Sequence, residues 1–333
     1  MKTTAVLGAG SWGTALAVHL ARAGHHVRLW ARDGVLVEEL RATRENARYL
    51  PGVGMSDAIA ATPSLEQALS GAKFVIVAVP SHGLRAVVQH AAPYLAPQAI
   101  LVSATKGIEV DSLQRMSQVI ESEVNGGCAT VVLSGPSFAM EVARGLPTAV
   151  LAASADSRAA AAVQEHFRGP GLRLYVNEDV AGVEIGGALK NVIAIAAGCV
   201  EGLGLGHNAL AALITRGLAE ISRLAIAEGG RRDTLAGLSG LGDLVLTCTG
   251  DLSRNRRVGI ELGHGRRLDD ILAGMHMVAE GVRTTRAALA LGARHGLELP
   301  IAAQMQDVLE ERSSPLSAVE ALMLRRQRAE ADG

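Results

Sequence analysis

The sequence predicts an α/β protein in two parts: a doubly wound parallel sheet over residues 1–180 and an all-α domain over residues 181–333. In the first part, short apolar and β-branched runs alternate with helix-like segments, which is typical of buried parallel strands joined by crossover helices. After about Val176 the pattern becomes helical, and no convincing strand follows. The length of 333 residues fits two domains of ordinary size.

Strands are expected where a short apolar run is bounded by turn residues. The first two are Thr3–Leu7 and His26–Trp30, with a helix at Thr14–Ala23 between them. Phe74–Val79 is a continuous apolar run that ends at Pro80, as expected for a strand buried on both faces. Further strands are expected at Ile100–Ser103, Thr130–Leu133 and Ala149–Ala152.

The second part is expected to consist of helices, with the domain boundary near residues 177–185 inside or beside the first of them. That helix, Val180–Val200, is rich in small and aliphatic residues, which predicts a buried position. The other expected helices are Ala209–Glu228, Leu268–Ala273, Thr284–His295 and Pro300–Glu310.

Composition and charge exclude several kinds of function. Lys plus Arg is 32 and Asp plus Glu is 33, so no general surface for nucleic acid or an anionic membrane is expected. The three cysteines, Cys128, Cys199 and Cys248, show no metal-ligand spacing, which predicts free thiols and no metal. The N-terminus lacks a signal-peptide pattern, and the longest apolar helical stretch, Val192–Val200, is far shorter than the roughly 20 residues that span a bilayer. We expect a soluble cytoplasmic protein.

A glycine-rich turn directly after the first strand predicts a dinucleotide site. Gly8, Gly10 and Gly13 form a G-x-G-x-x-G pattern that also opens the first helix. In such a turn the first glycine permits a tight bend, the second lets the backbone approach a pyrophosphate, and the third allows close helix–strand packing. The pattern alone is common in ordinary turns, but its strand–turn–helix context favours a Rossmann-like dinucleotide-binding domain.

The end of the second strand bears on the choice of cofactor. An acidic residue there holds the ribose 2′-hydroxyl of NAD, whereas an arginine accommodates the 2′-phosphate of NADP. Here Arg32 is followed by Asp33, so we favour NADP(H) with tolerance of NAD(H). The alternative is that Arg32 is an ordinary solvated arginine.

Lys190 is the most informative residue of the second part. It lies among Gly, Ala, Leu, Val and Ile in the expected helix Val180–Val200. Its ammonium could reach water along an apolar stem, or burial beside other polar groups could lower its pKa and make it an acid–base group. Two other segments carry polar residues: a lysine-containing segment just past a strand, Ser103–Gly107, and an expected glycine-rich loop, Gly237–Asn255.

Taken together, these segments resemble bacterial-type NAD(P)-dependent glycerol-3-phosphate dehydrogenase over nearly the whole chain. Several of the motifs are far more specific than the glycine pattern. Ser239 is a small departure from the family pattern. The motifs are GAGSWGTALA (8–17), VPSHGLR (79–85), SATKGIE (103–109), SGPSFAMEVARGLPTAV (134–150), VEIGGALKNVIAIAAG (183–198), GLSGLGDLVLTC (237–248), SRN (253–255) and MVAEGVRTT (277–285).

The resemblance implies three groups of site residues. The catalytic residues would be Lys190 as the acid–base group, Lys106 and Asp243. The cofactor, NADP(H) or NAD(H), would contact Gly8, Gly10, Ser11, Trp12, Gly13, Arg32, Tyr49, Lys106, Ala139, Arg254, Val278 and Glu280. The substrate would contact Lys106, Gly135, Ser137, Lys190, Asn191, Asp243, Thr247, Ser253, Arg254 and Asn255.

The implied reaction is the reversible reduction of dihydroxyacetone phosphate to sn-glycerol 3-phosphate for glycerophospholipid synthesis, carried out by a homodimer. A protonated Lys190 can donate to the carbonyl oxygen, and Lys106 can stabilise the negative charge that develops there. Arg254 offers a planar fork to the phosphate, although Ser253, Arg254 and Asn255 could equally form a plain polar turn.

Two rival functions stay open at this point. Another dehydrogenase of the same architecture, such as a ketopantoate reductase or 3-hydroxy acid dehydrogenase, would also use a helix lysine but would not need a phosphate-binding turn. A non-catalytic nicotinamide sensor would keep the glycine turn but has no need of Lys190, Lys106 and Asp243 together.

Overall fold

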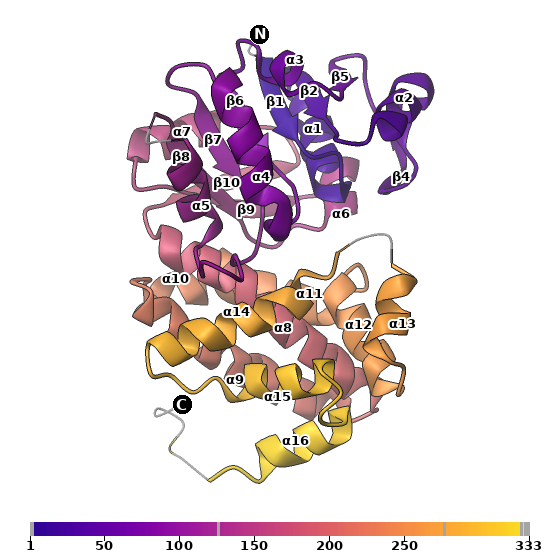
Figure 1. Ribbon diagram of the computed structural model, residues 1–333, viewed down its shortest axis with the longest axis vertical. Coiled ribbons are helices and arrows are strands. Elements are labelled where there is room, and N and C mark those ends of the chain that lie inside the picture. The colour runs from indigo at the N-terminus through magenta and orange to yellow at the C-terminus, as the bar shows by residue number, and fades with distance from the viewer. Residues whose placement is uncertain (1–2, 125–126, 276–277, 327–328, 330–333) are drawn as a thin grey trace. The chain divides into compact units, whose positions relative to one another are not determined.

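The computed structural model describes residues 3–124, 127–275, 278–326 and 329, so Met277 of the last quoted motif lies outside the described residues. The chain divides into two compact units, which we call the sheet unit and the helical unit (Figure 1). The sheet unit comprises the residues up to Lys106 together with Met116–Val180. The helical unit comprises Gly107–Arg115, which we expected in the first domain, together with the residues from Ala181 onward.

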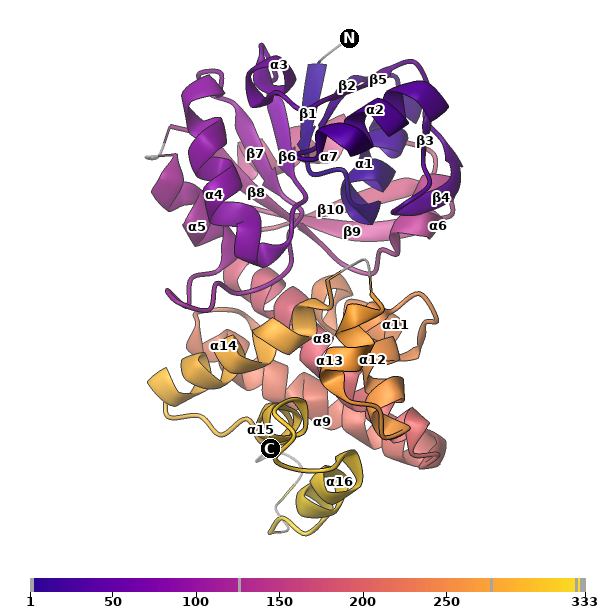
Figure 2. The same ribbon diagram turned by 45° about the vertical axis from the view of Figure 1, so that its right-hand side comes forward.

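Eight strands form one sheet in the spatial order β10-β9-β8-β7-β6-β1-β2-β5 (Figures 1 and 2). Neighbours are parallel except β8 and β9, because the chain turns back after β8 through the short helix α6 (Ala139–Arg144). The predicted fold class is confirmed with this one antiparallel exception. The strands are β1 (Thr3–Leu7), β2 (His26–Trp30), β5 (Ile59–Thr62), β6 (Phe74–Val77), β7 (Ile100–Ser103), β8 (Ala129–Ser134), β9 (Thr148–Ala153) and β10 (Leu172–Asn177).

The strands that the sequence did not reveal lie at the edges of the sheet or outside it. β5 and β10 are the two edge strands, and in β10 buried Leu172 and Leu174 alternate with exposed residues. An edge strand pairs on one side only and needs no continuous apolar run. The antiparallel pair β3 (Glu45–Asn46) and β4 (Leu50–Gly54) was also unexpected.

Helices cover both faces of the sheet. In β1, Val6 belongs to the core on one face and Leu7 to the core on the other, as strand alternation requires. The two cores account for the continuous apolar runs of the central strands. The first core includes residues of α1 (Ser11–Arg22), α2 (Gly34–Thr43) and α7 (Ser157–His166), and the second includes residues of α3 (Leu65–Leu69), α4 (Ser81–Ala91) and α5 (Met116–Glu123).

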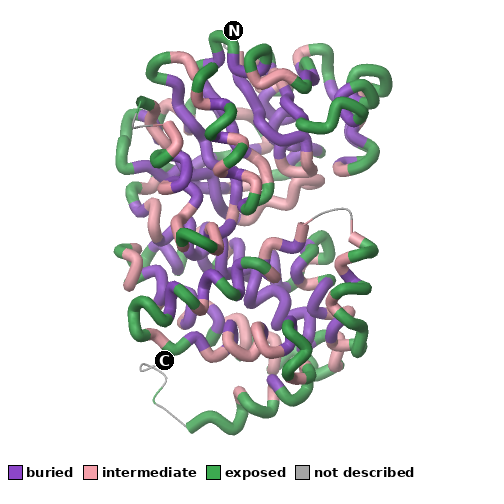
Figure 3. Tube along the Cα trace, in the orientation of Figure 1, coloured by how far each residue is buried: buried purple, intermediate pink, exposed green. Residues whose placement is uncertain are grey.

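The helical unit is built on α8 (Val180–Gly202), whose residues from Gly182 to Val200 are all buried. Among the described residues α8 alone is long and apolar enough to cross a membrane, but its entire apolar window is buried as a core helix. Figure 3 shows buried residues concentrated inside this unit. The other helices are α9 (Gly206–Ala227), α10 (Arg232–Ala236), α11 (Asp243–Thr249), α12 (Arg254–Gly263), α13 (Leu268–Ala273), α14 (Glu280–Arg294), α15 (Pro300–Leu309) and α16 (Pro315–Met323).

Helices α8 and α12 approach each other through facing glycines. An ideal Cβ on Gly198 would lie 2.0 Å from the carbonyl oxygen of Arg256, and one on Gly263 would lie 2.9 Å from the Cα of Gly202. No side chain fits at these points. The four-residue spacing of the glycines on each helix keeps them on one face, so the two backbones pack directly against each other.

Residues 237–255 are mostly helical, so the expectation of a glycine-rich loop was wrong. A π-helix over Leu238–Gly242 leads directly into α11. An ideal Cβ on Gly240 would lie 2.0 Å from the carbonyl oxygen of Leu235, so this glycine permits close packing of helical turns. Turns of π-helix are rare and frequently accompany functional sites. This one ends immediately before Asp243.

Candidate active site

The three glycines after β1 each meet the requirement of a dinucleotide turn. Gly8 has φ of 116°, and a Cβ on Gly13 would lie 1.9 Å from the carbonyl oxygen of Gly8. Open space surrounds the position of a Gly10 Cβ among the described residues. The first and third glycines are therefore fixed by backbone geometry and packing, and the second leaves room for a pyrophosphate at the start of α1.

Residues from the β3–β4 region support this turn. Asn46 is buried and donates from Nδ2 to the carbonyl oxygen of Ala9 at 2.9 Å and to Thr14 Oγ1 at 2.8 Å. Ser11 Oγ donates to the carbonyl oxygen of Tyr49 at 2.7 Å, which brings two expected cofactor residues together. Asn46 was missed by the sequence analysis, because no local pattern links it to a turn almost forty residues earlier.

Arg32 and Asp33 are used differently at the end of β2. Arg32 is exposed. The Asp33 carboxylate caps α2 by accepting from the backbone N–H groups of Val35 and Leu36, and it pairs with Arg48 at 3.1 Å. The hydrogen bond from Leu36, with smaller contributions from Val35 and Arg48, lowers the pKa of Asp33. Asp33 therefore already has structural partners, whereas Arg32 is exposed.

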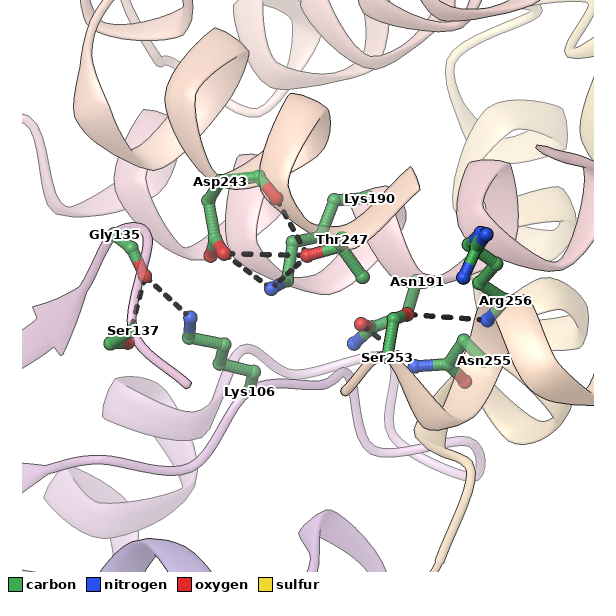
Figure 4. A network of polar contacts seen from close by, with 10 residues as sticks. All are labelled: Lys106, Gly135, Ser137, Lys190, Asn191, Asp243, Thr247, Ser253, Asn255 and Arg256. Carbon is green, nitrogen blue, oxygen red and sulfur yellow. Dashed lines mark hydrogen bonds and ion pairs between the residues drawn. The ribbon is translucent and has the colours of Figure 1, made fainter. Parts of the chain in front are cut away.

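Lys106 forms a cluster with the loop after β8. Its Nζ donates to the carbonyl oxygen of Gly135 at 3.0 Å, and Ser137 Oγ donates to the same oxygen at 2.9 Å (Figure 4). Gly135 has φ of 134°, and a Cβ there would lie 3.0 Å from the Cα of Val150. These residues follow two neighbouring strands at their carboxyl ends, where open α/β sheets bind ligands.

Lys190 lies in the middle of α8 and is held by two side chains of α11. Its Nζ donates to Asp243 Oδ1 at 2.5 Å and to Thr247 Oγ1 at 2.8 Å (Figure 4). The side chains of Lys190 and Asp243 are only 9% and 1% exposed. The Thr247 hydroxyl donates to the carbonyl oxygen of Asp243 at 2.6 Å, so its lone pairs face Lys190. A buried ammonium with a carboxylate and a hydroxyl in place is suited to proton transfer.

Close packing brings α11 to this position. An ideal Cβ on Gly186 of α8 would lie 2.8 Å from the carbonyl oxygen of Ser239 in the π-helix. The small residue lets the π-helix rest on α8 one turn before Lys190, which aims the following Asp243 at the lysine. The Ser239 hydroxyl is buried and has no hydrogen-bond partner among the described residues.

Asn255 joins three helices of the helical unit. Its Nδ2 donates to Asn191 Oδ1 at 3.0 Å, and its Oδ1 accepts from the backbone N–H of Gly281 in the first turn of α14 at 3.0 Å. Both ends of the amide thus bind protein groups, and the substrate contact expected for Asn255 stays a prediction. Val278 and Glu280, expected near the cofactor, lie half-buried at the start of α14.

Ser253, Arg254 and Asn255 form the N-cap and first turn of α12. Ser253 Oγ accepts from the backbone N–H of Arg256 at 3.2 Å. Arg254 contacts solvent, although surrounding protein lowers the pKa of its guanidinium and Glu280 opposes that shift. Backbone N–H groups at a helix N-terminus carry partial positive charge, so this turn and Arg254 are suited to a phosphate.

The structure thus gathers the expected residues into clusters within each unit. In the sheet unit these are the glycine turn with Ser11 and Tyr49, and Lys106 with Gly135 and Ser137. In the helical unit they are Lys190 with Asp243 and Thr247, and Asn191 with Asn255. Ala139 begins α6, directly after the second of the sheet-unit clusters.

Comparison with known proteins agrees with this arrangement. The family model described as NAD-dependent glycerol-3-phosphate dehydrogenase N-terminus matches residues 3–160, and the corresponding C-terminus model matches residues 179–320. The chain is 54% identical to glycerol-3-phosphate dehydrogenase [NAD(P)+] of Geobacter sulfurreducens over 98% of each chain. It is 55% identical to the protein of that name from Acidobacterium capsulatum over 99% of this chain and 100% of the relative.

A solved structure extends the similarity to the fold. The crystal structure of glycerol-3-phosphate dehydrogenase from Coxiella burnetii superposes with a TM-score of 0.94 at 41% identity, covering 97% of this chain and 99% of that one. Both family models and full-length relatives at more than half identity lead to one conclusion. The chain belongs to the NAD-dependent glycerol-3-phosphate dehydrogenase family.

Proposed function

We propose that the protein catalyses the reversible NAD(P)H-dependent reduction of dihydroxyacetone phosphate to sn-glycerol 3-phosphate, which supplies glycerophospholipid synthesis. The observation that carries the proposal is the buried Lys190–Asp243–Thr247 cluster. A protein that merely binds a nicotinamide cofactor has no need to bury a lysine against a carboxylate, since burying charge is costly unless it is paired.

Lys190 holds the proton for the reaction. When bound, the nicotinamide supplies a hydride to the carbonyl carbon of the substrate. Negative charge then develops on the carbonyl oxygen, and Lys190 Nζ donates its proton there. Asp243 and Thr247 keep Nζ in one orientation, so little reorganisation is required as the charge forms. In the reverse direction Lys190 accepts the proton from the alcohol.

Lys106, Gly135 and Ser137 contribute to substrate binding in this proposal. The Gly135 carbonyl fixes the Lys106 ammonium at the carboxyl ends of β7 and β8. Its positive charge is suited to stabilising a developing oxyanion, and Ser137 adds a hydroxyl group. Asn191 presents an amide oriented by Asn255.

The phosphate group of the substrate would bind at the N-terminus of α12. Arg254 offers a planar fork of donors, and the Ser253 hydroxyl lies at the helix N-cap. This turn favours a phosphorylated substrate over the substrates of ketopantoate reductases or 3-hydroxy acid dehydrogenases. Asn255 contributes by holding Asn191 and the start of α14.

The residues after β2 favour NADP(H) over NAD(H). Arg32 is exposed where the 2′-phosphate would bind, and Asp33 is already engaged by backbone N–H groups and by Arg48. The other residues that would contact the cofactor are Gly8, Gly10, Ser11, Trp12, Gly13, Tyr49, Lys106, Ala139, Arg254, Val278 and Glu280. The buried Trp12 Nε1, which has no hydrogen-bond partner among the described residues, fits such a role.

The test is NADPH oxidation at 340 nm with dihydroxyacetone phosphate, run beside dihydroxyacetone, NADH and a Lys190→Ala variant. We expect rapid oxidation only with the phosphorylated substrate, faster with NADPH than with NADH at low cofactor concentration, and loss of activity in the variant. A folded protein that binds NADPH but oxidises none with the phosphate ester would contradict the proposal. It would support the sensor function if no other carbonyl compound is reduced either.

We further propose that the protein is cytoplasmic and forms a homodimer, the oligomeric state implied by the family resemblance. Leu241, Val245 and Leu252 are exposed on the helical unit and offer apolar area to a second copy. Light scattering at micromolar concentration tests this assembly, and a monomer mass would contradict it.

A further inference from the structure

We propose that Arg256 is a positioning residue that clamps the phosphate-binding turn Ser253–Asn255 to helix α8 through Glu201. The inference rests on the function proposed above. It concerns a residue that the motif SRN does not include, and it explains how the substrate's phosphate and carbonyl groups are held at a fixed separation.

Each of the three nitrogens of the Arg256 guanidinium donates to a carboxylate. Nε and Nη2 donate to the two oxygens of Glu201, each at 2.8 Å, and Nη1 donates to Asp251 at 3.1 Å. The Arg256 side chain is only 14% exposed. The charge of Arg256 is thus paired with two carboxylates, whereas Arg254, two residues earlier, is exposed.

The backbone of Arg256 is fixed as firmly as its side chain. Its N–H donates to Ser253 Oγ at 3.2 Å, and its carbonyl oxygen lies where a Gly198 side chain would be. Glu201 follows Gly198 by three residues, so it lies on the same side of α8. The glycine contact sets the separation of α8 and α12, and the bidentate ion pair fixes how α12 slides or rotates on α8.

This arrangement matters because α8 also carries Lys190 and Asn191. Arg254 is attached to the first turn of α12, and Lys190 is attached to the helix on which that turn is clamped. A substrate whose phosphate meets Arg254 and whose carbonyl meets Lys190 requires both groups at a fixed separation. Displacements of about 1 Å can lower rates by 10²-fold.

A purely stabilising role predicts a different result. Loss of stability alone lowers the melting temperature and leaves the Michaelis constants of the folded enzyme unchanged. A positioning role raises KM for dihydroxyacetone phosphate and leaves kcat/KM for dihydroxyacetone unchanged, because dihydroxyacetone has no phosphate to misplace.

The experiment compares Arg256→Gln, Arg256→Lys and Glu201→Gln with the wild type. The matched control is Arg266→Gln, which removes a more exposed arginine paired with Glu261. We expect Arg256→Gln to raise KM for dihydroxyacetone phosphate about 10- to 100-fold, the effect of weakening charge-assisted hydrogen bonds to the phosphate. Glu201→Gln should have a smaller effect in the same direction, and Arg256→Lys should restore part of the loss, since lysine keeps the charge but not the fork.

An unchanged KM for dihydroxyacetone phosphate in folded Arg256→Gln would overturn the inference, as would an equal rise in Arg266→Gln. If Arg256→Gln does not fold, the result for Glu201→Gln decides by the same criterion. Failure of the wild type to oxidise NADPH with dihydroxyacetone phosphate would instead contradict the proposed function, so the two failures are distinguishable.

Discussion

The two units hold their reactive lysines in different ways. In the sheet unit, Lys106 follows a strand and donates to the backbone carbonyl of Gly135. In the helical unit, Lys190 lies mid-helix and donates to the side chains of Asp243 and Thr247. A sheet brings groups together where its strands end, whereas a helix bundle needs a buried side-chain network. The contact of Lys106 cannot be removed by a side-chain substitution at Gly135, because its acceptor is a backbone carbonyl. The contacts of Lys190 can be removed one at a time by substituting Asp243 or Thr247.

The units also bury ionisable groups of opposite character. His19 of α1 is buried in the sheet unit and bonds to the carbonyl oxygen of Phe167 at 2.8 Å. Glu220 of α9 is buried in the helical unit and accepts from the backbone N–H groups of Ile301 and Ala302 at the start of α15, each at 2.9 Å. Burial disfavours the charged form of both, so the two units should respond to pH in opposite directions.

The largest expected effect separates the two lysines by their chemistry. Lys190→Met should lower kcat by about 10² to 10⁴-fold because it removes the proton donor. Lys106→Met should lower kcat by about 10² to 10³-fold through loss of electrostatic stabilisation. The residual activity of Lys190→Met should lose the pH dependence that Lys106→Met retains. Measurement of kcat from pH 6 to pH 10 checks this, and identical pH profiles would remove the distinction.

The next effect concerns the network around Lys190. Asp243→Asn keeps the shape of the side chain but leaves a buried ammonium without its carboxylate, which should lower the free energy of unfolding by about 3–5 kcal/mol. Asp57→Asn, which alters the fully exposed carboxylate beside Arg44, serves as the matched control and should leave the free energy of unfolding nearly unchanged. Urea unfolding followed by circular dichroism compares the two. Equal losses would show that the carboxylate in the network is not special.

The opposite pH responses come from the pKa shifts of His19 and Glu220. Burial lowers the pKa of His19 below 6.5, with its hydrogen bond to Phe167 opposing, so stability falls as pH drops from 6.5 toward the lowered value. Burial raises the pKa of Glu220 above 4.5, with the N–H groups of Ala302 and Ile301 opposing. In the folded state Glu220 then stays protonated at pH values where it ionises in the unfolded state. The free energy of unfolding therefore falls as pH rises from 4.5 toward the raised pKa.

Urea unfolding between pH 4 and pH 8 tests this pair. Both tryptophans, Trp12 and Trp30, lie in the sheet unit, so their fluorescence reports that unit while circular dichroism at 222 nm is weighted toward the helices. His19→Gln should reduce the loss of stability as pH falls below 6.5, and Glu220→Gln should reduce the loss of stability as pH rises above 4.5. His207→Gln, on the exposed start of α9, should change neither pH dependence. If the pH dependence of stability is unchanged in His19→Gln or in Glu220→Gln, that residue is not its source.

The smallest effect compares two buried hydroxyls that have no hydrogen-bond partner among the described residues. Ser103 lies in β7 and Ser239 lies in the π-helix before α11. Replacing either by alanine removes a desolvated polar group, which should stabilise by about 1 kcal/mol. Ser239→Ala should gain more, because alanine favours helical segments and disfavours strands. Thermal melts of the two variants measure the difference. A larger gain in melting temperature for Ser103→Ala than for Ser239→Ala would contradict the prediction.

The sequence allowed much of this structure to be predicted. The glycine turn, the central strands and the apolar helix around Lys190 all follow from local patterns with a direct physical meaning. These patterns also carried the family resemblance, which the comparisons confirm. The edge strands β5 and β10 lacked such a signal because one paired side and partial exposure do not require a continuous apolar run.

Other features depended on contacts between distant residues. The glycines of residues 237–242 were interpreted as a loop because glycine is common in loops, but Gly240 is required by close packing against Leu235. The contacts of Asn46 with Ala9 and of Asn255 with Gly281 join residues far apart in sequence. The capping role of Asp33 is set by the start of α2, which the sequence analysis did not predict.

The assignment of Gly107–Arg115 to the helical unit has a consequence for synthesis on the ribosome. This segment is translated before residues Met116–Val180 of the sheet unit. Its Ile108 is buried in a core formed with α8 and later helices. At about 5–20 residues per second, several seconds pass before α8 is made. During that interval Ile108 and its neighbours have no core to join, so the nascent chain carries an exposed apolar segment until the helices that cover it emerge.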